Sequence, residues 1–529
     1  MKRNIICFST VFFMTVLSLF PIQGQNFDFK QYSDSNIENS DAYKKGNIYQ
    51  KDLLLFIDIL KECHPAFSAE HKFPFNIDSI ANVGYHWAAQ CKDVPILKSY
   101  LQAISTRIND GHTSLLPDVN KNLVYPFLFF IDNEKLYLRG INKEYELFLG
   151  KQIDQINRHS VSDVLNSFRK VISSDNDIYF LDKVNDFMQL YSVWESNPYC
   201  LKDSSLTLTF TDNTTVSLHP VSMNQINLVL QQPKNQINSI RENTKQPFLY
   251  KLLSEKNICY LQFNTCTDQS TLRSQYYMNN STDIPEDVEK KLSQYPRFDM
   301  FLKEMFQEID SQKIKTLVID VRNNGGGDSK LCDVLLSWLK PLKEIKQGTS
   351  FIRFSTLWKQ QYPVLAAEYE QSFAEKQLPL EIGKLYDNSF LSKLLEKKNE
   401  TSVLGKIDKY FVKNNDEDKV FKGNIIFIQN AKTYSSAGLL ITAAVDNSIG
   451  IVVGNKSSYR PCSYGDLLAW ELPNTKIRGF VSHKIFNRSN MDKCDESSLT
   501  PTIYIPTSWV DVLNGEDVYW NWILENYVK

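Results

Sequence analysis

The chain lacks a strong excess of either charge and contains few glycines and prolines. Its 529 residues include 59 Lys and Arg against 61 Asp and Glu, a formal net charge of -2. This balance, without a dense basic cluster, argues against a nucleic-acid-binding surface. Gly and Pro number 19 each, which excludes a collagen-like or low-complexity chain. The composition is that of a globular protein, and the length predicts about three domains.

Several familiar ligand-binding motifs are also missing. No CxxC pair occurs, so neither a zinc site nor a thioredoxin-like redox site is expected. There is no GxGxxG, and no Lys-Ser/Thr pair follows the glycine-rich segment 322–328 to complete a phosphate-binding loop. The GxSxG elbow of the α/β-hydrolases is absent as well. The sequence therefore implies no metal and no cofactor.

A single apolar run of export-signal character stands at the amino terminus. Lys2 and Arg3 precede an apolar stretch from Ile5 to about Phe20, and Gly24 is followed by polar residues. This order predicts a signal peptide over residues 1–24. An uncleaved anchor is the alternative, although a span needs about 20 apolar residues. We expect an exported protein, periplasmic or extracellular, with no membrane span after cleavage. Eight cysteines then remain, which permits disulfides, although most are expected to be buried thiols.

Hydrophobic periodicity divides the remaining chain into three regions. Apolar residues recur every three or four positions between 49 and 108, which predicts helices. Alternating residues between 123 and 221 predict strands, including a hairpin over 205–219. From 248 onward, apolar strands alternate with amphipathic helices, as in an α/β core. The polar stretch 343–420 within it is expected to be an insertion over the core.

The first segment with chemical potential is glycine-rich. Residues 322–328 directly follow the apolar strand expected at 315–321, and they include Gly325, Gly326 and Gly327. Three glycines permit a tight turn with exposed backbone N–H groups. Such groups can hold a phosphate or stabilise an oxyanion. A simple strand-to-helix turn is the structural alternative.

The second and third segments contain hydroxyl groups and an imidazole. Ser435 and Ser436 lie between an apolar strand at 423–429 and a helix at 436–446. The partial positive charge at a helix amino end favours a developing oxyanion, although serine is also a common helix cap. His112 stands in the polar stretch 109–114, where a base would be accessible. A lone histidine is nevertheless more often structural than catalytic.

Taken together, the order and spacing of these segments resemble the C-terminal-processing (tail-specific) and tricorn-core serine peptidases, over most of the mature chain. The matching motifs are Asp110-Gly-His-Thr113 of the tricorn-like branch, Val318 to Gly327, Thr433 to Gly438, Val453-Gly454, Arg460-Pro461, Tyr464-Gly465 and Leu472 to Thr475. The resemblance implies an α/β fold with a Clp-protease/crotonase-like catalytic core. Residues 150–157 are similar to the PDZ segment common in that family.

This resemblance also implies a domain organisation. We expect a signal peptide over 1–24 and an N-terminal helical domain with the histidine motif over 25–118. A PDZ-like β-rich domain is expected over 119–222. The serine peptidase core would then cover 223–529, with the insertion at about 343–420.

The family's roles can be placed on matching residues. Ser435 would be the nucleophile, and His112 would take its proton and pass it to the leaving amine. The backbone N–H groups of Gly326 and Ser436 would form the oxyanion hole. A carboxylate should orient the histidine; the residue near the family's position is Glu496, with Asp495 and Asp446 as alternatives.

Two positions depart from the family pattern. Arg460 stands where the Ser/Lys branch has its lysine, and arginine cannot act as a base, which favours the histidine mechanism. Pro501-Thr502 replaces the family's Pro-Asp, which leaves open a slow or inactive enzyme. The sequence thus predicts an exported serine endopeptidase acting on peptides or on unfolded or C-terminal protein segments. A catalytically inactive peptide-binding protein and an esterase are the alternatives.

Overall fold

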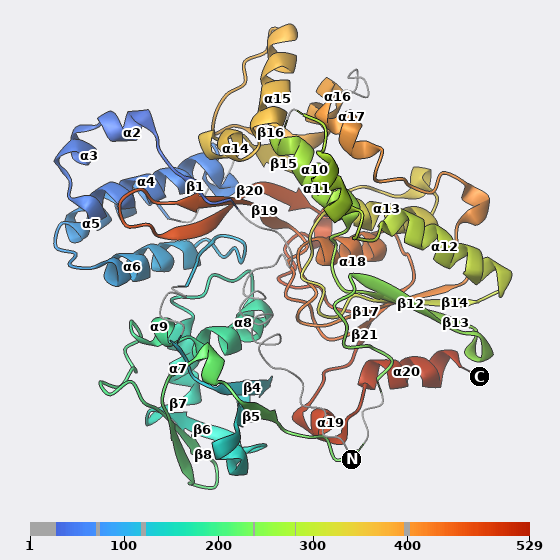
Figure 1. The fold of residues 1–529 in the computed structure, drawn as a ribbon, viewed down its shortest axis with the longest axis horizontal. Helices are drawn as coiled ribbons and strands as arrows, with labels where there is room; N and C mark the ends of the chain where they lie inside the picture. Colours follow the sequence, from blue (N-terminus) through green and yellow to red (C-terminus); the bar gives the residue numbers. More distant parts are fainter. Residues whose placement is uncertain are drawn as a thin grey trace.

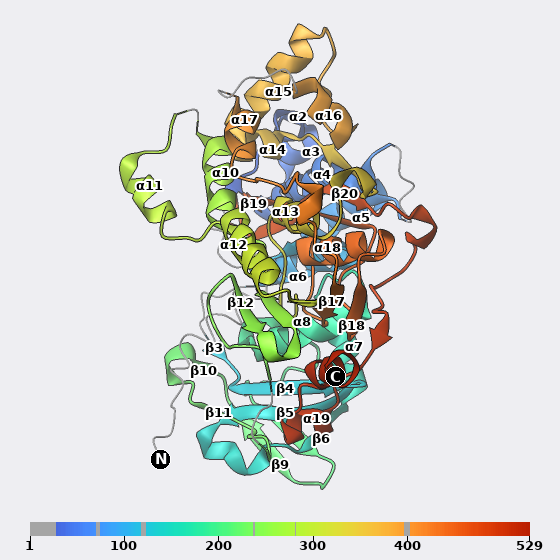
Figure 2. The same ribbon diagram turned by 90° about the vertical axis from the view of Figure 1, so that its right-hand side faces the viewer.

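The computed structural model describes residues 28–69, 75–117, 123–235, 239–280, 282–395 and 402–528. The expected signal peptide, 1–24, lies outside these ranges. Four sheets and their helices form an α/β fold with a helical N-terminal region and a β-rich domain (Figures 1 and 2), which confirms the predicted fold class. In the described ranges, no helix combines the length and apolarity that a membrane crossing requires.

A six-stranded sheet forms the centre of the α/β region. Its first two strands are antiparallel and all later pairs are parallel. The order is β12 (Phe248–Leu253), β13 (Ile258–Phe263), β14 (Thr316–Asp320), β17 (Asn424–Gln429), β18 (Ile451–Gly454) and β21 (Ile503–Tyr504). The inner strands are apolar along nearly their whole length because helices cover both faces of the sheet.

Alternate side chains of the sheet enter two different cores. Leu261 and Leu317 belong to a large cluster with α12 (Phe298–Ser311), α13 (Ser329–Leu339) and α18 (Ser436–Asp446). Tyr260 and Val318, one position away, pack on the other face with Trp520 and Ile523 of α20 (Val518–Tyr527). This is the period-two pattern of a sheet buried on both sides. The helix predicted at 436–446 is confirmed with those bounds.

A second sheet joins distant parts of the sequence. The long hairpin of β19 (Ser463–Glu471) and β20 (Arg478–Asn487) is extended by β15 (Thr349–Arg353) and β16 (Leu385–Asp387) from the 343–420 segment. Strands β1 (Lys30–Gln31) and β2 (Ser114–Leu115) pair with β19 and β20 respectively. The β2 pairing fixes the end of the 109–114 segment against the α/β region.

The N-terminal helices share the large core of the α/β region. Asn47 caps α4 (Ile48–Cys63) with a capping box, and Asn76 and Asp93 cap α5 (Ile77–Ala88) and α6 (Val94–Thr106). Their apolar faces lie in the same cluster as the inner side of the central sheet. The 343–420 segment adds further helices to this cluster: α14 (Thr356–Gln361), α15 (Pro363–Glu375), α16 (Asn388–Leu395) and α17 (Val403–Asp408).

The β-rich domain has a core of its own. Its seven-stranded sheet runs β11 (Leu228–Leu230), β5 (Lys135–Asn142), β6 (Gln152–Ile156), β8 (Leu206–Phe210) and β9 (Thr215–Leu218), with β4 (Phe127–Asp132) on β5 and β7 (His159–Ser160) on β6. The predicted hairpin is confirmed, since β8 and β9 pair antiparallel. Helices α7 (Val161–Phe168), α8 (Asp177–Gln189) and α9 (Tyr191–Trp194) pack on this sheet, and Figure 1 places α8 toward the α/β region.

One disulfide, Cys462–Cys494, is present among the described residues, and six described cysteines are free. Most of the cysteines were expected to be buried thiols; the structure buries Cys63, Cys259, Cys266 and Cys332, and leaves Cys91 and Cys200 partly exposed.

A buried histidine on β20 predicts that the fold weakens in acid. The His483 side chain is 1% exposed, and its Nδ1 lies 2.6 Å from the Asp466 carbonyl. Burial lowers the pKa of His483 to about 4, although the Asp466 carboxylate opposes this. The unfolded chain takes up a proton below about pH 6.5, while the folded chain stays neutral until about pH 4. Stability present above pH 6.5 is therefore lost toward pH 4, on the order of 3 kcal/mol.

Urea unfolding of the wild type and His483→Gln at pH 7.5 and 4.5 measures this loss. The variant, which cannot titrate there, is expected to lose less stability between the two pH values. Equal losses in the two proteins would contradict the prediction.

Candidate active site

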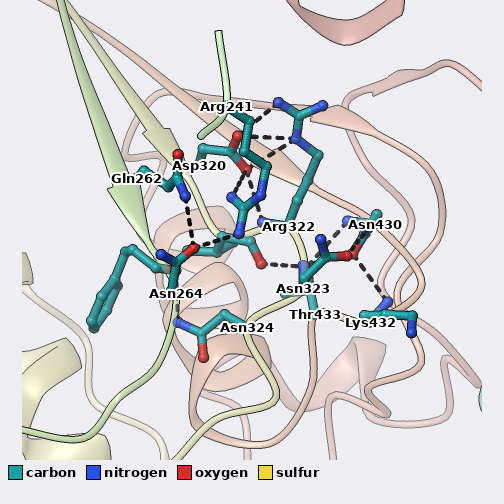
Figure 3. Close-up of polar contacts among 12 residues, drawn as sticks. Arg241, Gln262, Asn264, Asp320, Arg322, Asn323, Asn324, Asn430, Lys432 and Thr433 are labelled. Carbon is teal, nitrogen blue, oxygen red and sulfur yellow. Dashed lines mark hydrogen bonds and ion pairs between the residues drawn. The ribbon is translucent and has the colours of Figure 1, made fainter. Parts of the chain in front are cut away.

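Two loops meet because the strands before them are parallel neighbours. Asp320 of β14 lies opposite Ile428 of β17, so both strands end at the same edge of the sheet. The Tyr434 N–H donates to the Asn324 carbonyl at 3.0 Å. Figure 3 shows Asn323 facing Asn430, whose Nδ2 donates to Asn323 Oδ1 at 2.8 Å. The glycine-rich and serine-containing segments are thereby joined into one site.

A buried network of ion pairs holds the first residues of the glycine-rich loop in place. Arg322 contacts Asp320 through Nη2 at 2.7 Å and Asp517 through Nη1 at 2.8 Å. Arg241 approaches Asp320 from the other side (Figure 3). Burial raises the pKa of Asp320, but Arg322 and Arg241 outweigh it and hold that pKa below its ordinary value. The carboxylate therefore stays charged and fixes the loop's first residue.

Ser435 occupies a strained corner between β17 and α18. Its backbone has φ 50° and ψ -125°, a region that serine rarely adopts. It is the residue before the first turn of α18, but its hydroxyl makes no capping bond to that helix. Strain at a sharp strand-to-helix turn is the backbone arrangement that exposes a nucleophile in other hydrolases. Ser435 is half-buried, and its hydroxyl makes no hydrogen bond among the described residues, at the amino end of a helix.

Gly326 packs directly against this serine. Its φ is 103°, and a Cβ at this position would lie 2.7 Å from Ser435 Cβ and 2.9 Å from the Ser436 nitrogen. Only glycine fits there without displacing backbone. The Gly326 N–H donates to Asn324 Oδ1 at 2.9 Å. Both backbone N–H groups expected in the oxyanion hole therefore lie next to Ser435. The Ser436 N–H has no acceptor among the described residues, whereas the Gly326 N–H is bonded to Asn324.

His112 lies beside the residue that precedes Ser435. Its ring stacks on Tyr434 with centroids 4.7 Å apart, and its Nδ1 is 3.0 Å from the Tyr434 hydroxyl. Its Nε2 is buried and has no hydrogen-bond partner among the described residues. Ser435 and His112 are therefore not hydrogen-bonded in this structure. Such bonds often form only when substrate binds.

Asp110 anchors the histidine loop. One of its oxygens accepts from Thr113 and Ser482, each at 2.6 Å, and the other accepts the His112 N–H at 3.0 Å. His64 Nε2 is 3.1 Å from Asp110, while its Nδ1 accepts the Ala66 N–H, so the His64 proton is on Nε2. Burial raises the pKa of Asp110, but its bonds with the two histidines outweigh this and hold it well below the ordinary value.

Asp175 is a site residue that the sequence did not indicate. It precedes α8 of the β-rich domain, and its carboxylate accepts the Tyr434 hydroxyl and, at 3.1 Å, the Gly111 N–H. Burial first, and then the charge of Asp110, raise the pKa of Asp175 to about 6. No motif surrounds it, and its partner Tyr434 is distant in sequence. Tyr434 itself belonged to a recognised segment, where only its neighbours were assigned roles.

Glu496 is placed elsewhere. Its carboxylate pairs with Arg488 at 2.7 Å, and Arg488 also pairs with Asp446. The Arg488 side chain is fully buried, so it requires these carboxylates for charge compensation. Neither these two acids nor Asp495 forms a hydrogen bond or ion pair with His112 among the described residues. The structure therefore does not bring the expected orienting carboxylate to the histidine.

Arg460 and a group of three acidic residues near the N-terminal helices are further charged residues. Arg460 has a buried Nε without a hydrogen-bond partner among the described residues. Asp34, Asp58 and Glu62 have carboxylate oxygens within 4.8 Å of one another. This grouping lies at the N-terminal helices, where the Tyr32 hydroxyl bonds to Asp58 and Glu62. The residues around Ser435 themselves can supply a nucleophile, a proton acceptor and oxyanion donors.

Comparison with known proteins finds a family similarity for the part of the chain that contains Gly326 and Ser435. Residues 291–504 match the model of Peptidase family S41, and no curated protein matches the chain. Mature CPAF has a TM-score of 0.57 at 13% identity, covering 92% of this chain and 96% of its own. Mature CPAF complexed with lactacystin has 0.57 at 14%, covering 92% and 98%. The photosystem II D1 C-terminal processing protease has 0.38 at 12%, covering 89% and 99%. Residues 291–504, which include Gly326 and Ser435, are therefore similar to the domain of Peptidase family S41.

Proposed function

We propose that this chain is an exported serine endopeptidase in which Ser435 is the nucleophile and His112 is the general base. The observation that carries the proposal is the strained, unengaged Ser435 beside an imidazole whose Nε2 is buried without a partner. A buried nitrogen without a hydrogen bond costs stability, so its retention is consistent with a functional role. The family domain supports the reaction class.

The proposed reaction follows from these groups. His112 Nε2 takes the proton of Ser435 Oγ as the oxygen attacks the peptide carbonyl. The Ser436 N–H, at the positive end of α18, stabilises the resulting oxyanion. His112 then gives the proton to the leaving amine, and water hydrolyses the acyl-enzyme by the reverse proton path.

Substrate binding must tighten this arrangement. Ser435 Oγ and His112 Nε2 have to reach about 2.6–3.2 Å, and Gly326 can donate to the oxyanion only after its N–H leaves Asn324. Gly326 already packs on Ser435, and the His112 ring already packs on Tyr434, the residue before Ser435.

The substrates are peptides or unfolded and C-terminal protein segments, which the β-rich domain would position near the serine. Export to the periplasm or the extracellular space accounts for the leader sequence. The Cys462–Cys494 disulfide also supports an oxidising compartment.

Covalent labelling tests the proposal. The mature chain is treated with a fluorophosphonate probe and digested for mass spectrometry, and its turnover of an unfolded protein is followed in parallel. We expect the label on Ser435 and new internal cleavage products. A folded sample that gives neither label nor cleavage would contradict the proposal.

A catalytically inactive peptide-binding protein is the second candidate. The missing Ser435–His112 bond and the engaged Gly326 N–H favour it. It predicts saturable peptide binding without labelling or product, so the same experiment separates the two functions.

A further inference from the structure

We propose that Tyr434 and Asp175 position His112 by fixing its ring proton on Nδ1, which leaves Nε2 free to accept the proton of Ser435. This inference rests on the proposed function. It replaces a carboxylate that contacts the imidazole directly with a carboxylate that acts through a tyrosine hydroxyl.

The direction of the hydrogen bonds follows from the single proton of a phenol. The Tyr434 hydroxyl donates to Asp175 Oδ2 in a short contact. Its oxygen can then only accept at the 3.0 Å contact with His112 Nδ1. Nδ1 must therefore carry the proton of the neutral ring, and Nε2 holds the lone pair that a general base requires.

The contacts of Asp175 orient its carboxylate as the hydrogen-bond acceptor for Tyr434. Its Oδ1 accepts the Gly111 N–H at 3.1 Å, so Oδ2 faces Tyr434. The raised pKa of Asp175, about 6, still leaves the carboxylate charged at neutral pH. Burial, followed by the charge of Asp175, raises the pKa of Tyr434 far above its ordinary value, so the phenol keeps its proton.

Asp110 is the competing orienting group, and the geometry disfavours it. Its Oδ1 is 3.5 Å from His112 Nδ1, farther than the Tyr434 oxygen. That oxygen already accepts the His112 N–H, and Oδ2 accepts from three side chains: His64, Thr113 and Ser482. Asp110 therefore fixes the loop backbone, while Tyr434 is left to engage the ring proton.

The surroundings make this chain of bonds persistent. His112, Tyr434 and Asp175 are 3%, 4% and 9% exposed, so water does not compete well for their polar atoms. The stacking of the two rings also restricts rotation of the imidazole. The three residues come from the helical region, the α/β region and the β-rich domain, and each is fixed by its own local structure.

Two substitutions test the chain of bonds. Tyr434→Phe removes the acceptor and keeps the stacked ring, and we expect kcat to fall about 10²-fold with KM nearly unchanged. Asp175→Asn should be more harmful. Its carbonyl would accept the Gly111 N–H, and its NH₂ would then donate to Tyr434, which turns the tyrosine proton toward Nδ1.

The double variant should be no worse than Asp175→Asn, because both substitutions act on the same chain of hydrogen bonds. Tyr459→Phe is the control, because this buried tyrosine packs on the Tyr434 ring but forms no hydrogen bond or ring contact with His112 among the described residues.

A spectroscopic measurement separates positioning from a structural role. In ¹⁵N-histidine NMR of the wild type, with His112 assigned by His112→Gln, we expect the proton on Nδ1. The signal should shift toward the Nε2–H form in Asp175→Asn. A wild-type His112 with its proton on Nε2 overturns the proposal without the use of any variant, so a variant that fails to fold does not block the test.

The outcomes also separate this inference from the proposed function. Loss of turnover in Ser435→Ala, with full kcat in both Tyr434→Phe and Asp175→Asn, overturns the positioning role alone. Turnover that survives in Ser435→Ala overturns the proposed function.

Discussion

Replacing Ser435 with alanine is expected to lower kcat/KM for peptide hydrolysis by about 10⁴- to 10⁶-fold. The hydroxyl would form the bond to the substrate carbonyl, and the neighbouring Ser436 cannot take its place because its own hydroxyl donates to the Gly327 carbonyl at 2.6 Å. Ser435 Oγ makes no hydrogen bond among the described residues, so its removal should leave the unfolding free energy nearly unchanged. Hydrolysis of a fluorogenic peptide and urea unfolding measure the two quantities.

A serine remote from the site provides the control. Ser392 lies on α16, is exposed and bonds only to its own helix at the Asn388 carbonyl. Ser392→Ala should keep wild-type activity. An active Ser435→Ala protein, verified free of contaminating peptidase by its mass and purity, would refute the assignment of the nucleophile.

Replacing Arg322 with methionine is expected to destabilise the fold by about 3–5 kcal/mol. Methionine preserves much of the side-chain volume but leaves the buried Asp320 and Asp517 without their main counter-charge. Arg241 reaches Asp320 at 3.3 Å and compensates only part of this loss. The cost should appear as a lower midpoint in urea unfolding, and it should shrink in acid, where Asp320 takes up a proton.

An exposed ion pair serves for comparison. Lys45 and Asp41 are 2.9 Å apart, but both side chains are more than three-quarters exposed. Lys45→Gln should therefore change stability by no more than about 0.5 kcal/mol. Equal effects of Arg322→Met and Lys45→Gln would show that the buried network contributes no special stability.

The sequence predicted the strands and helices of the central sheet well because their signal is local. The apolar runs of β14 and β17 and the amphipathic stripe of α12 are set by burial of neighbouring residues. The glycine-rich and serine segments could also be located, since each directly follows such a strand. Parallel pairing then makes their meeting at one sheet edge a consequence of the fold.

The environment of the histidine could not be predicted from local pattern. Tyr434 and Asp175 are 259 positions apart, and the Tyr434–His112 contact spans 322. These contacts depend on the pairing of the two-residue strand β2 with β20, which leaves almost no trace in hydrophobic periodicity. Glu496 was expected near His112 only because it lies near the family's position for the orienting carboxylate. The buried Arg488, the residue directly after β20, determines its actual contact.

The pairing of β2 with β20 also has a practical consequence for the preparation of recombinant fragments. A fragment cut to the family-matched boundaries, 291–504, would contain the serine and the glycine-rich turn but lack the imidazole, both aspartates that surround it, and strands β12 and β13 of the central sheet. Such a truncated protein would expose one side of β14 and the uncovered edge of β20. It should aggregate rather than hydrolyse peptides, so only preparations that begin before the N-terminal helices can report on catalysis.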